Sequence, residues 1–146
     1  MANIIPDSFK SSLLAGTHDF LYGVSTDTYK FALYTDISGY STASTVYQTG
    51  SEVSSSGTNY VTGGNDLALD TLSGSVPGSN TAIVDFVNET FLNVTLTAVG
   101  GAIYNSSQGN KLVLVLDFGG TKTATSGDFT IQFPNPTATD AIIRLG

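Results

Sequence analysis

The stretch LVLVLDFGGTKT, residues 112–123, comes closest to a chemical motif in this chain. Asp117 followed by paired glycines and a Thr is typical of the phosphate hairpin of sugar kinases, and Asp117-Phe118-Gly119 matches the metal-binding triplet of protein kinases. A sugar kinase needs a second lobe after the hairpin, and a protein kinase needs a Gly-rich loop, a strand Lys and a catalytic Asp before it. This chain has neither set. We therefore predict that DFGG is the exit turn of a buried strand, without a nucleotide role.

Other catalytic and metal-binding residues are few. His18 is the only histidine and there is no cysteine, so a small hydrolase with a Ser-His-Asp set would need His18, and no G-x-S-x-G elbow supports it. We predict a turn or capping role for His18 rather than metal ligation. Asp66 and Asp70 share a strand face about 13 Å apart, too far for one metal ion. Asp85 and Asp117 are expected to bond neighbouring turns. We expect no enzymatic activity, no metal and no cofactor.

The tyrosines offer a different kind of site. Tyr34, Tyr40, Tyr47 and Tyr60 lie in or beside a region rich in Gly, Ser and Thr, residues 35–64. Exposed rings there could stack on sugars, whereas tyrosines on half-buried strands usually pack against the fold. We favour packing for the group, and we keep Tyr40 and Tyr47 as candidate exposed recognition aromatics.

The charge balance limits the choice of partner. Twelve acidic residues against five basic ones give a formal net charge of −7 at pH 7, spread along the chain. Such a surface repels phosphate backbones, so we expect no nucleic-acid partner. The first residues, MANIIPDSFK, lack the basic and long apolar regions of a signal peptide. No run approaches the 18 apolar residues of a membrane span, so we expect no membrane partner.

From residue 29 onward the pattern predicts an all-β fold. The expected strands are YKFALY (29–34), DLALDTL (66–72), TAIVDFV (81–87), FLNVTLTAV (91–99), GAIYN (101–105), KLVLVLDF (111–118), DFTIQF (128–133) and AIIRL (141–145). About eight strands at short, turn-punctuated spacing favour an antiparallel β-sandwich or a jelly-roll-like barrel. The strand 111–118 is apolar on both faces and is therefore predicted for the middle of the sheet.

The N-terminal segment predicts one short helix, in PDSFKSSLLAG. We divide the chain into an N-terminal arm with this helix, residues 1–20, and a single β-sandwich domain, residues 21–146. A two-turn helix cannot persist alone in water, so its apolar face must be buried. We predict that the segment is an assembly element outside the sandwich core; the alternative is that the helix plugs its own sandwich. The candidate assembly contacts are Ile4, Ile5, Phe9, Leu13 and Leu14.

The chain also resembles a protein family. The frames SFKSSLLAGTHDF, DTYKFALYT, GNDLAL, AIVDF, GAIYNSSQGNKLVLVLDFGGTKT, GDFTIQF and AIIRL resemble, in this order, small virion proteins of tailed bacteriophages, many from aquatic bacteria. AIYNSS and VLDFGG are the most specific parts, and residues 35–64 depart most from the family. The resemblance carries no catalytic motif.

The resemblance implies a structural role in the particle. A capsid decoration (cement) protein would bind the outer surface of the major capsid protein lattice as a homo-oligomer, with trimers as one form. Such a protein is made in the host cytoplasm and ends in the virion. The alternative is a tail or neck component that binds a host glycan.

Overall fold

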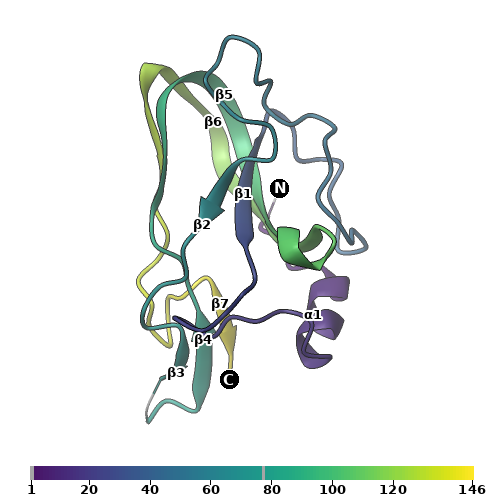
Figure 1. Ribbon diagram of the computed structural model, residues 1–146, viewed down its shortest axis with the longest axis vertical. Coiled ribbons are helices and arrows are strands. Elements are labelled where there is room, and N and C mark those ends of the chain that lie inside the picture. Colours follow the sequence, from purple (N-terminus) through teal and green to yellow (C-terminus); the bar gives the residue numbers. More distant parts are fainter. Residues whose placement is uncertain (1, 77) are drawn as a thin grey trace.

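The computed structural model describes residues 2–76 and 78–146 (Figure 1). It contains two antiparallel sheets and one short α-helix. The elements are α1 (Asp7–Leu14), β1 (Tyr29–Tyr34), β2 (Asn65–Leu67), β3 (Gly74–Val76), β4 (Thr81–Val84), β5 (Glu89–Asn105), the 3-10 turn η1 (Ser106–Gln108), β6 (Lys111–Ile131) and β7 (Ile143–Leu145). The sheets have the strand orders β2-β1-β5-β6 and β3-β4-β7. The fold is mostly β and sandwich-like, as predicted. Within the described residues, no helix is long and apolar enough to cross a membrane.

Strand β1 is central in the larger sheet and is covered on both faces. It pairs with β2 through Phe31 and Asn65, and with β5 through Phe31 and Ile103. Phe31 and its neighbours on the same face join the main core. The opposite face carries Tyr34, which packs in a second cluster with Tyr40 from the loop of residues 35–64. That loop therefore replaces a third layer of regular structure on the outer face of the sheet.

Strands β5 and β6 form one long ribbon that bends over on itself. Their pairing runs from Glu89 and Ile131 to Asn105 and Lys111. Along a straight strand Phe118 and Phe129 would lie about 36 Å apart, yet their ring centroids are 6.1 Å apart. Figure 1 shows the resulting arch at one end of the molecule. Several register shifts allow the bend, because bulges increase local twist and curvature. The four strands predicted at 91–99, 101–105, 111–118 and 128–133 are thus two long strands.

Strand β6 lies at an edge of its sheet, not in the middle as predicted. Its residues 112–115 are nonetheless buried, because other segments cover this part of the strand. Ile4 and Val115 exchange backbone hydrogen bonds of 2.9 and 2.8 Å, so the N-terminal arm adds a short strand-like segment at the edge. From residues 35–64, the Thr45 carbonyl accepts a hydrogen bond from the Leu112 N–H at 3.0 Å.

The DFGG segment is a bulge inside β6, so the predicted exit turn is wrong. Val99 of β5 faces residues 118–121 of β6, and the ladder continues on both sides of this shift. As expected, the two glycines adopt backbone angles that other residues rarely adopt, with φ values of 71° at Gly119 and 145° at Gly120. The Oδ1 atom of Asp117 accepts a hydrogen bond of 2.8 Å from the Gly119 N–H. This bond fixes the start of the bulge and confirms the predicted local role of Asp117.

Candidate assembly surface

Helix α1 divides its apolar residues between the domain and the solvent. Phe9 is buried in the main core, with its ring centroid 5.2 Å from His18 and 6.1 Å from Phe20. Leu13 packs against the same core and is partly buried. Leu14 points away from it and is 88% exposed. The sequence predicts Phe9 as an assembly contact outside the core, but the structure places it inside, because burying its apolar face is what stabilises so short a helix.

The two isoleucines ahead of the helix also differ in their surroundings. Ile4 is half-buried and forms the backbone bridge to β6, whereas Ile5 is exposed. Asn3 adds a second contact, since its Oδ1 atom accepts a hydrogen bond of 2.9 Å from the Asp117 N–H. Residue 1 of the predicted arm lies outside the described residues. Contacts of Asn3, Ile4, Phe9 and Leu13 hold the N-terminal segment against the sandwich, and Ile5 and Leu14 are the exposed members of the predicted contact set.

A mostly apolar groove of about 260 Å³ lies between α1 and the smaller sheet. Figure 1 shows α1 beside the end of the molecule that carries β7 and the C-terminus. We call this feature the α1 groove, and its lining consists of Phe9, Leu13, His18, Phe20, Gly74, Ala82, Ile83, Val84, Ile143 and Leu145. Except for the His18 ring, these side chains are aliphatic or aromatic, so the groove suits an apolar occupant.

One exposed leucine lines the α1 groove, and two more follow lining residues in the sequence. Leu145 lines it and is 55% exposed. Leu14 and Leu21, which are 88% and 63% exposed, follow directly after the lining residues Leu13 and Phe20. Exposed apolar side chains that gather beside an apolar recess are typical of a surface that a partner covers. The sequence anticipates Leu14 through helical periodicity, but no pattern indicates Leu21 or Leu145.

His18 is buried among aromatic rings, so the predicted turn or capping role is wrong. Its side chain is 6% exposed, and its ring stacks on Phe20 with centroids 6.0 Å apart. The Nδ1 atom lies 3.2 Å from the Nδ2 atom of Asn105. Burial lowers the pKa of His18, although the nearby Asp27 carboxylate opposes this effect. The sequence could not indicate this partner, because Asn105 lies on a distant strand.

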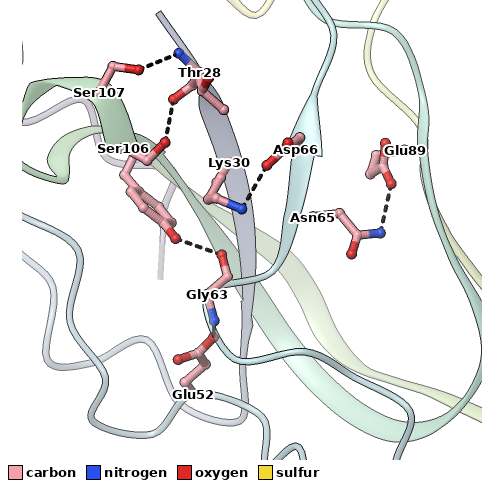
Figure 2. Close-up of polar contacts among 10 residues, drawn as sticks. Thr28, Lys30, Glu52, Gly63, Asn65, Asp66, Glu89, Ser106 and Ser107 are labelled. Carbon is pink, nitrogen blue, oxygen red and sulfur yellow. Dashed lines mark hydrogen bonds and ion pairs between the residues drawn. The ribbon is translucent and has the colours of Figure 1, made fainter.

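Residues 105–107 (NSS), where β5 ends and η1 begins, hold the loop before β1 in place. Figure 2 shows Ser106 and Ser107 beside Thr28. The Ser106 hydroxyl donates to the Thr28 carbonyl at 2.9 Å, and the Thr28 N–H donates to the Ser107 hydroxyl at 2.9 Å. The Asn105 side chain accepts from the Ser107 N–H at 3.1 Å and donates to the Asp27 carboxylate at 2.7 Å. Part of the AIYNSS motif therefore positions the segment that carries His18.

The two candidate recognition tyrosines are not free rings. Tyr40 is 4% exposed, and its hydroxyl donates a 2.8 Å hydrogen bond to the Tyr34 hydroxyl. The prediction of an exposed Tyr40 is therefore wrong. Tyr47 is half-buried, stacks on Tyr104 with centroids 4.5 Å apart, and donates a hydrogen bond to the Glu52 carboxylate. The favoured alternative, that these tyrosines pack the 35–64 segment onto the sheet, is confirmed.

Glu52 joins several parts of this tyrosine layer. Its Oε1 atom accepts hydrogen bonds of 2.7 Å from the Tyr60 hydroxyl and 2.6 Å from the Gly63 N–H, and the latter contact is drawn in Figure 2. The Gly63 carbonyl in turn accepts a 2.7 Å bond from the Tyr104 hydroxyl. Burial raises the pKa of Tyr104 to about 12, so this phenol stays protonated at neutral pH. Residues 35–64 therefore form a hydrogen-bonded layer over the sheet.

The acidic residues that the sequence singles out serve local contacts. Asp66 pairs with Lys30 at 2.7 Å across β1 and β2, as Figure 2 shows, and the Oδ1 atom of Asp70 accepts from the Leu72 N–H at 2.9 Å. Buried Asp85 accepts from backbone N–H groups on both carboxylate oxygens, as predicted. Throughout residues 2–76 and 78–146, no three His, Asp or Glu side chains form a group that could hold a metal ion.

A wider groove of about 460 Å³ lies over the bulge of β6. Its lining includes Phe118, Phe129, Ile131 and Phe133, together with Asp117 and Lys122. Of the described residues in this lining, Lys122 is the only cation, and the Gly119 N–H already bonds to Asp117. That DFGG has no nucleotide role stays a prediction.

Comparisons of the chain with protein-family models, curated proteins and solved structures found no match. Its function must therefore be inferred from its own residues.

Proposed function

We propose that this chain is a structural protein of a tailed bacteriophage virion, and that it decorates the outer surface of the major capsid protein lattice as a cement protein. The observation that carries the proposal is the mostly apolar α1 groove with the exposed Leu145 in its lining; the exposed Leu14 and Leu21 follow lining residues in the sequence and are further candidate anchors. The resemblance of the sequence to small virion proteins is the reason for proposing a phage particle as its location. The bent β5–β6 ribbon supports the finer expectation of a jelly-roll-like sandwich.

The energetics suit attachment to a repeated surface. Complete burial of one large aliphatic side chain contributes about 1.5–3 kcal/mol, and Leu14, Leu21 and Leu145 are largely available for such burial. A few anchors per copy are sufficient when each copy also contacts its neighbours on a lattice. The net charge of −7 keeps the free chain soluble and unsuited to packaged nucleic acid.

The proposal includes the partners and the place of action. The partner is the major capsid protein or another virion protein, and the chain forms a homo-oligomer, with trimers as one form. It is made in the host cytoplasm and acts on the capsid surface without a cofactor or catalysis. The tail or neck alternative with glycan binding has lost one of its two candidate aromatics, because Tyr40 is buried.

The decisive experiment measures rebinding to particles from which the chain has been stripped. The Leu14→Ser and Leu21→Ser double variant should rebind at least tenfold more weakly than the parent chain, because two anchors become polar. Leu92→Ser is the matched control, since Leu92 is 68% exposed but lies on β5 away from the lining of the α1 groove. This control should rebind like the parent chain.

Two results would contradict the proposal. One is full occupancy by the double variant, which would remove the α1 groove as the attachment surface. The other is a copy number in purified particles far below that of the major capsid protein on a stained gel, which would favour the tail or neck alternative.

A further inference from the structure

The neighbours of His18 hold its ring in one tautomer. The amide of Asn105 has a fixed orientation, because its Oδ1 atom accepts from the Ser107 N–H at 3.1 Å and its Nδ2 atom donates to Asp27 at 2.7 Å. The same Nδ2 atom faces the Nδ1 atom of His18 at 3.2 Å. Because Nδ2 can only donate, Nδ1 must accept, and the proton of the neutral ring is on Nε2.

A second proton on His18 conflicts with this arrangement. It would place an N–H on Nδ1 opposite the N–H of Asn105, so that two donors face each other. Asn105 cannot turn its amide without losing its bonds to both Asp27 and Ser107. The buried Nε2 atom has no hydrogen-bond partner within residues 2–76 and 78–146. Protonation would thus add a positive charge and a second unsatisfied donor, on Nδ1, to a side chain that is 6% exposed and whose Nε2–H already lacks a partner.

The charged groups around His18 do not remove this conflict. Burial is the largest influence on its pKa and lowers it; Asp27 opposes burial, and Lys111 at the start of β6 adds to it. The Asp27 carboxylate already accepts from Asn105, from the Gln108 side chain at 3.0 Å and from the Asp19 N–H at 2.9 Å.

The remaining polar neighbours of His18 have partners of their own. The carboxylate of Asp19 accepts from the Leu21 N–H at 2.9 Å. Tyr29 of β1 presents its ring to His18, and burial holds the pKa of its hydroxyl far above neutrality. On α1, Asp7 and Lys10 pair with each other at the surface at 2.9 Å.

We propose that His18 is an acid-sensitive latch for helix α1. Uptake of a proton drives the imidazole out of its contact with Phe9, whose ring centroid lies 5.2 Å away, and α1 then leaves the sandwich. Phe9, His18 and Phe20 all line the α1 groove, so the same event dismantles that groove. The latch itself is a property of the isolated chain; only its consequence for capsid attachment rests on the proposed function.

The sign of the pH dependence follows from linkage. In the undocked state His18 is in water and has its ordinary pKa of about 6.5, whereas in the docked state its pKa is lower. The undocked state therefore binds more protons between these two values. Docking is at full strength above pH 6.5, and the undocked fraction rises about tenfold for each pH unit below it until the docked pKa is reached.

The test uses two measurements on the isolated chain between pH 7.5 and 5.0. His18 is the only histidine, so its ring signals in an NMR titration give its pKa without assignment by mutation, and the midpoint should lie below 6.5. Amide hydrogen exchange then reports docking. The N–H groups of Ala15 and Thr17 cap the C-terminal end of α1 by bonding to the carbonyls of Ser11 and Ser12. Their protection should fall about tenfold per pH unit below 6.5, after correction for intrinsic exchange. Amides of the central strand β1 should stay protected.

The control is His18→Phe, which keeps an aromatic ring in the cluster and cannot titrate. Its α1 protection should not change with pH over the same range. A His18 midpoint at or above 6.5 overturns the latch, as does constant α1 protection in the parent chain or an equal loss in His18→Phe. If His18→Phe does not fold, the titration and exchange data of the parent chain decide the matter. Rebinding to stripped particles at pH 7.5 and 5.5 is measured separately, so a failure of attachment at both values counts against the proposed function and leaves the latch to the solution data.

Discussion

Replacing Phe9 by alanine tests whether α1 belongs to the folding unit. Phe9 is buried and contacts the rings of His18 and Phe20. Truncation of a buried phenylalanine to alanine costs about 3–5 kcal/mol. The lower end applies here, because Phe9 also lines the α1 groove and water can enter part of the space it vacates. We expect a loss of about 3 kcal/mol in the free energy of unfolding, which corresponds to a fall of about 6–12 °C in the melting temperature.

The measurement is unfolding by heat and by urea, followed by circular dichroism and tyrosine fluorescence, since the chain has no tryptophan. Leu14→Ala on the same helix is the matched control, because Leu14 is 88% exposed and its truncation should change stability by less than about 0.5 kcal/mol. A Phe9→Ala variant that melts within about 1 °C of the parent chain would refute the reasoning. Residues 2–20 would then be a detachable arm, as the sequence suggests.

Two further substitutions test the layer over the sheet and the close packing beneath it. Glu52→Gln should destabilise the chain by about 1–3 kcal/mol and speed proteolysis within residues 35–64, because Tyr60 and other donors lose a charged acceptor; unchanged proteolysis would contradict the role of Glu52. Gly101→Ala should lower the free energy of unfolding by about 1–3 kcal/mol in a urea titration, since its Cβ would lie 2.3 Å from the Phe31 ring. Gly50→Ala, where a Cβ meets nothing within 4 Å, is the control, and equal effects of the two changes would refute the packing argument.

The fold class follows from the sequence because alternation of apolar residues is a local property. Residues 29–34 alternate and form β1 with the predicted bounds. The predicted division into strands is wrong where a glycine serves close packing rather than a turn. Gly100 and Gly101 suggest a break between strands, but β5 continues through them because Phe31 packs against the Gly101 backbone. A contact between separate strands of this kind leaves no periodic signal.

The candidate site is predictable only in part for the same reason. Helical periodicity shows that α1 has an apolar face, but not that Phe9 enters its own core while Leu14 remains outside. The sequence favours packing for the tyrosines near residues 35–64 but does not show which rings stay exposed, and the candidate Tyr40 is buried among neighbours on the sheet with its hydroxyl bonded to Tyr34. His18 and Asn105 are 87 residues apart, so only the assembled fold brings them together.

The bent β5–β6 ribbon also determines the order in which the sandwich can assemble. Asn105 and Lys111 pair across the short turn that contains η1, and each later pair down to Glu89 and Ile131 adds to a ladder that already exists. Closing a short loop carries a small entropic penalty, and a hairpin forms within microseconds. Strand β1 pairs with residues far along the chain, so its addition is the slow, long-range step. Substitutions near the turn should therefore slow refolding, because they weaken a ladder that must exist before β1 is added.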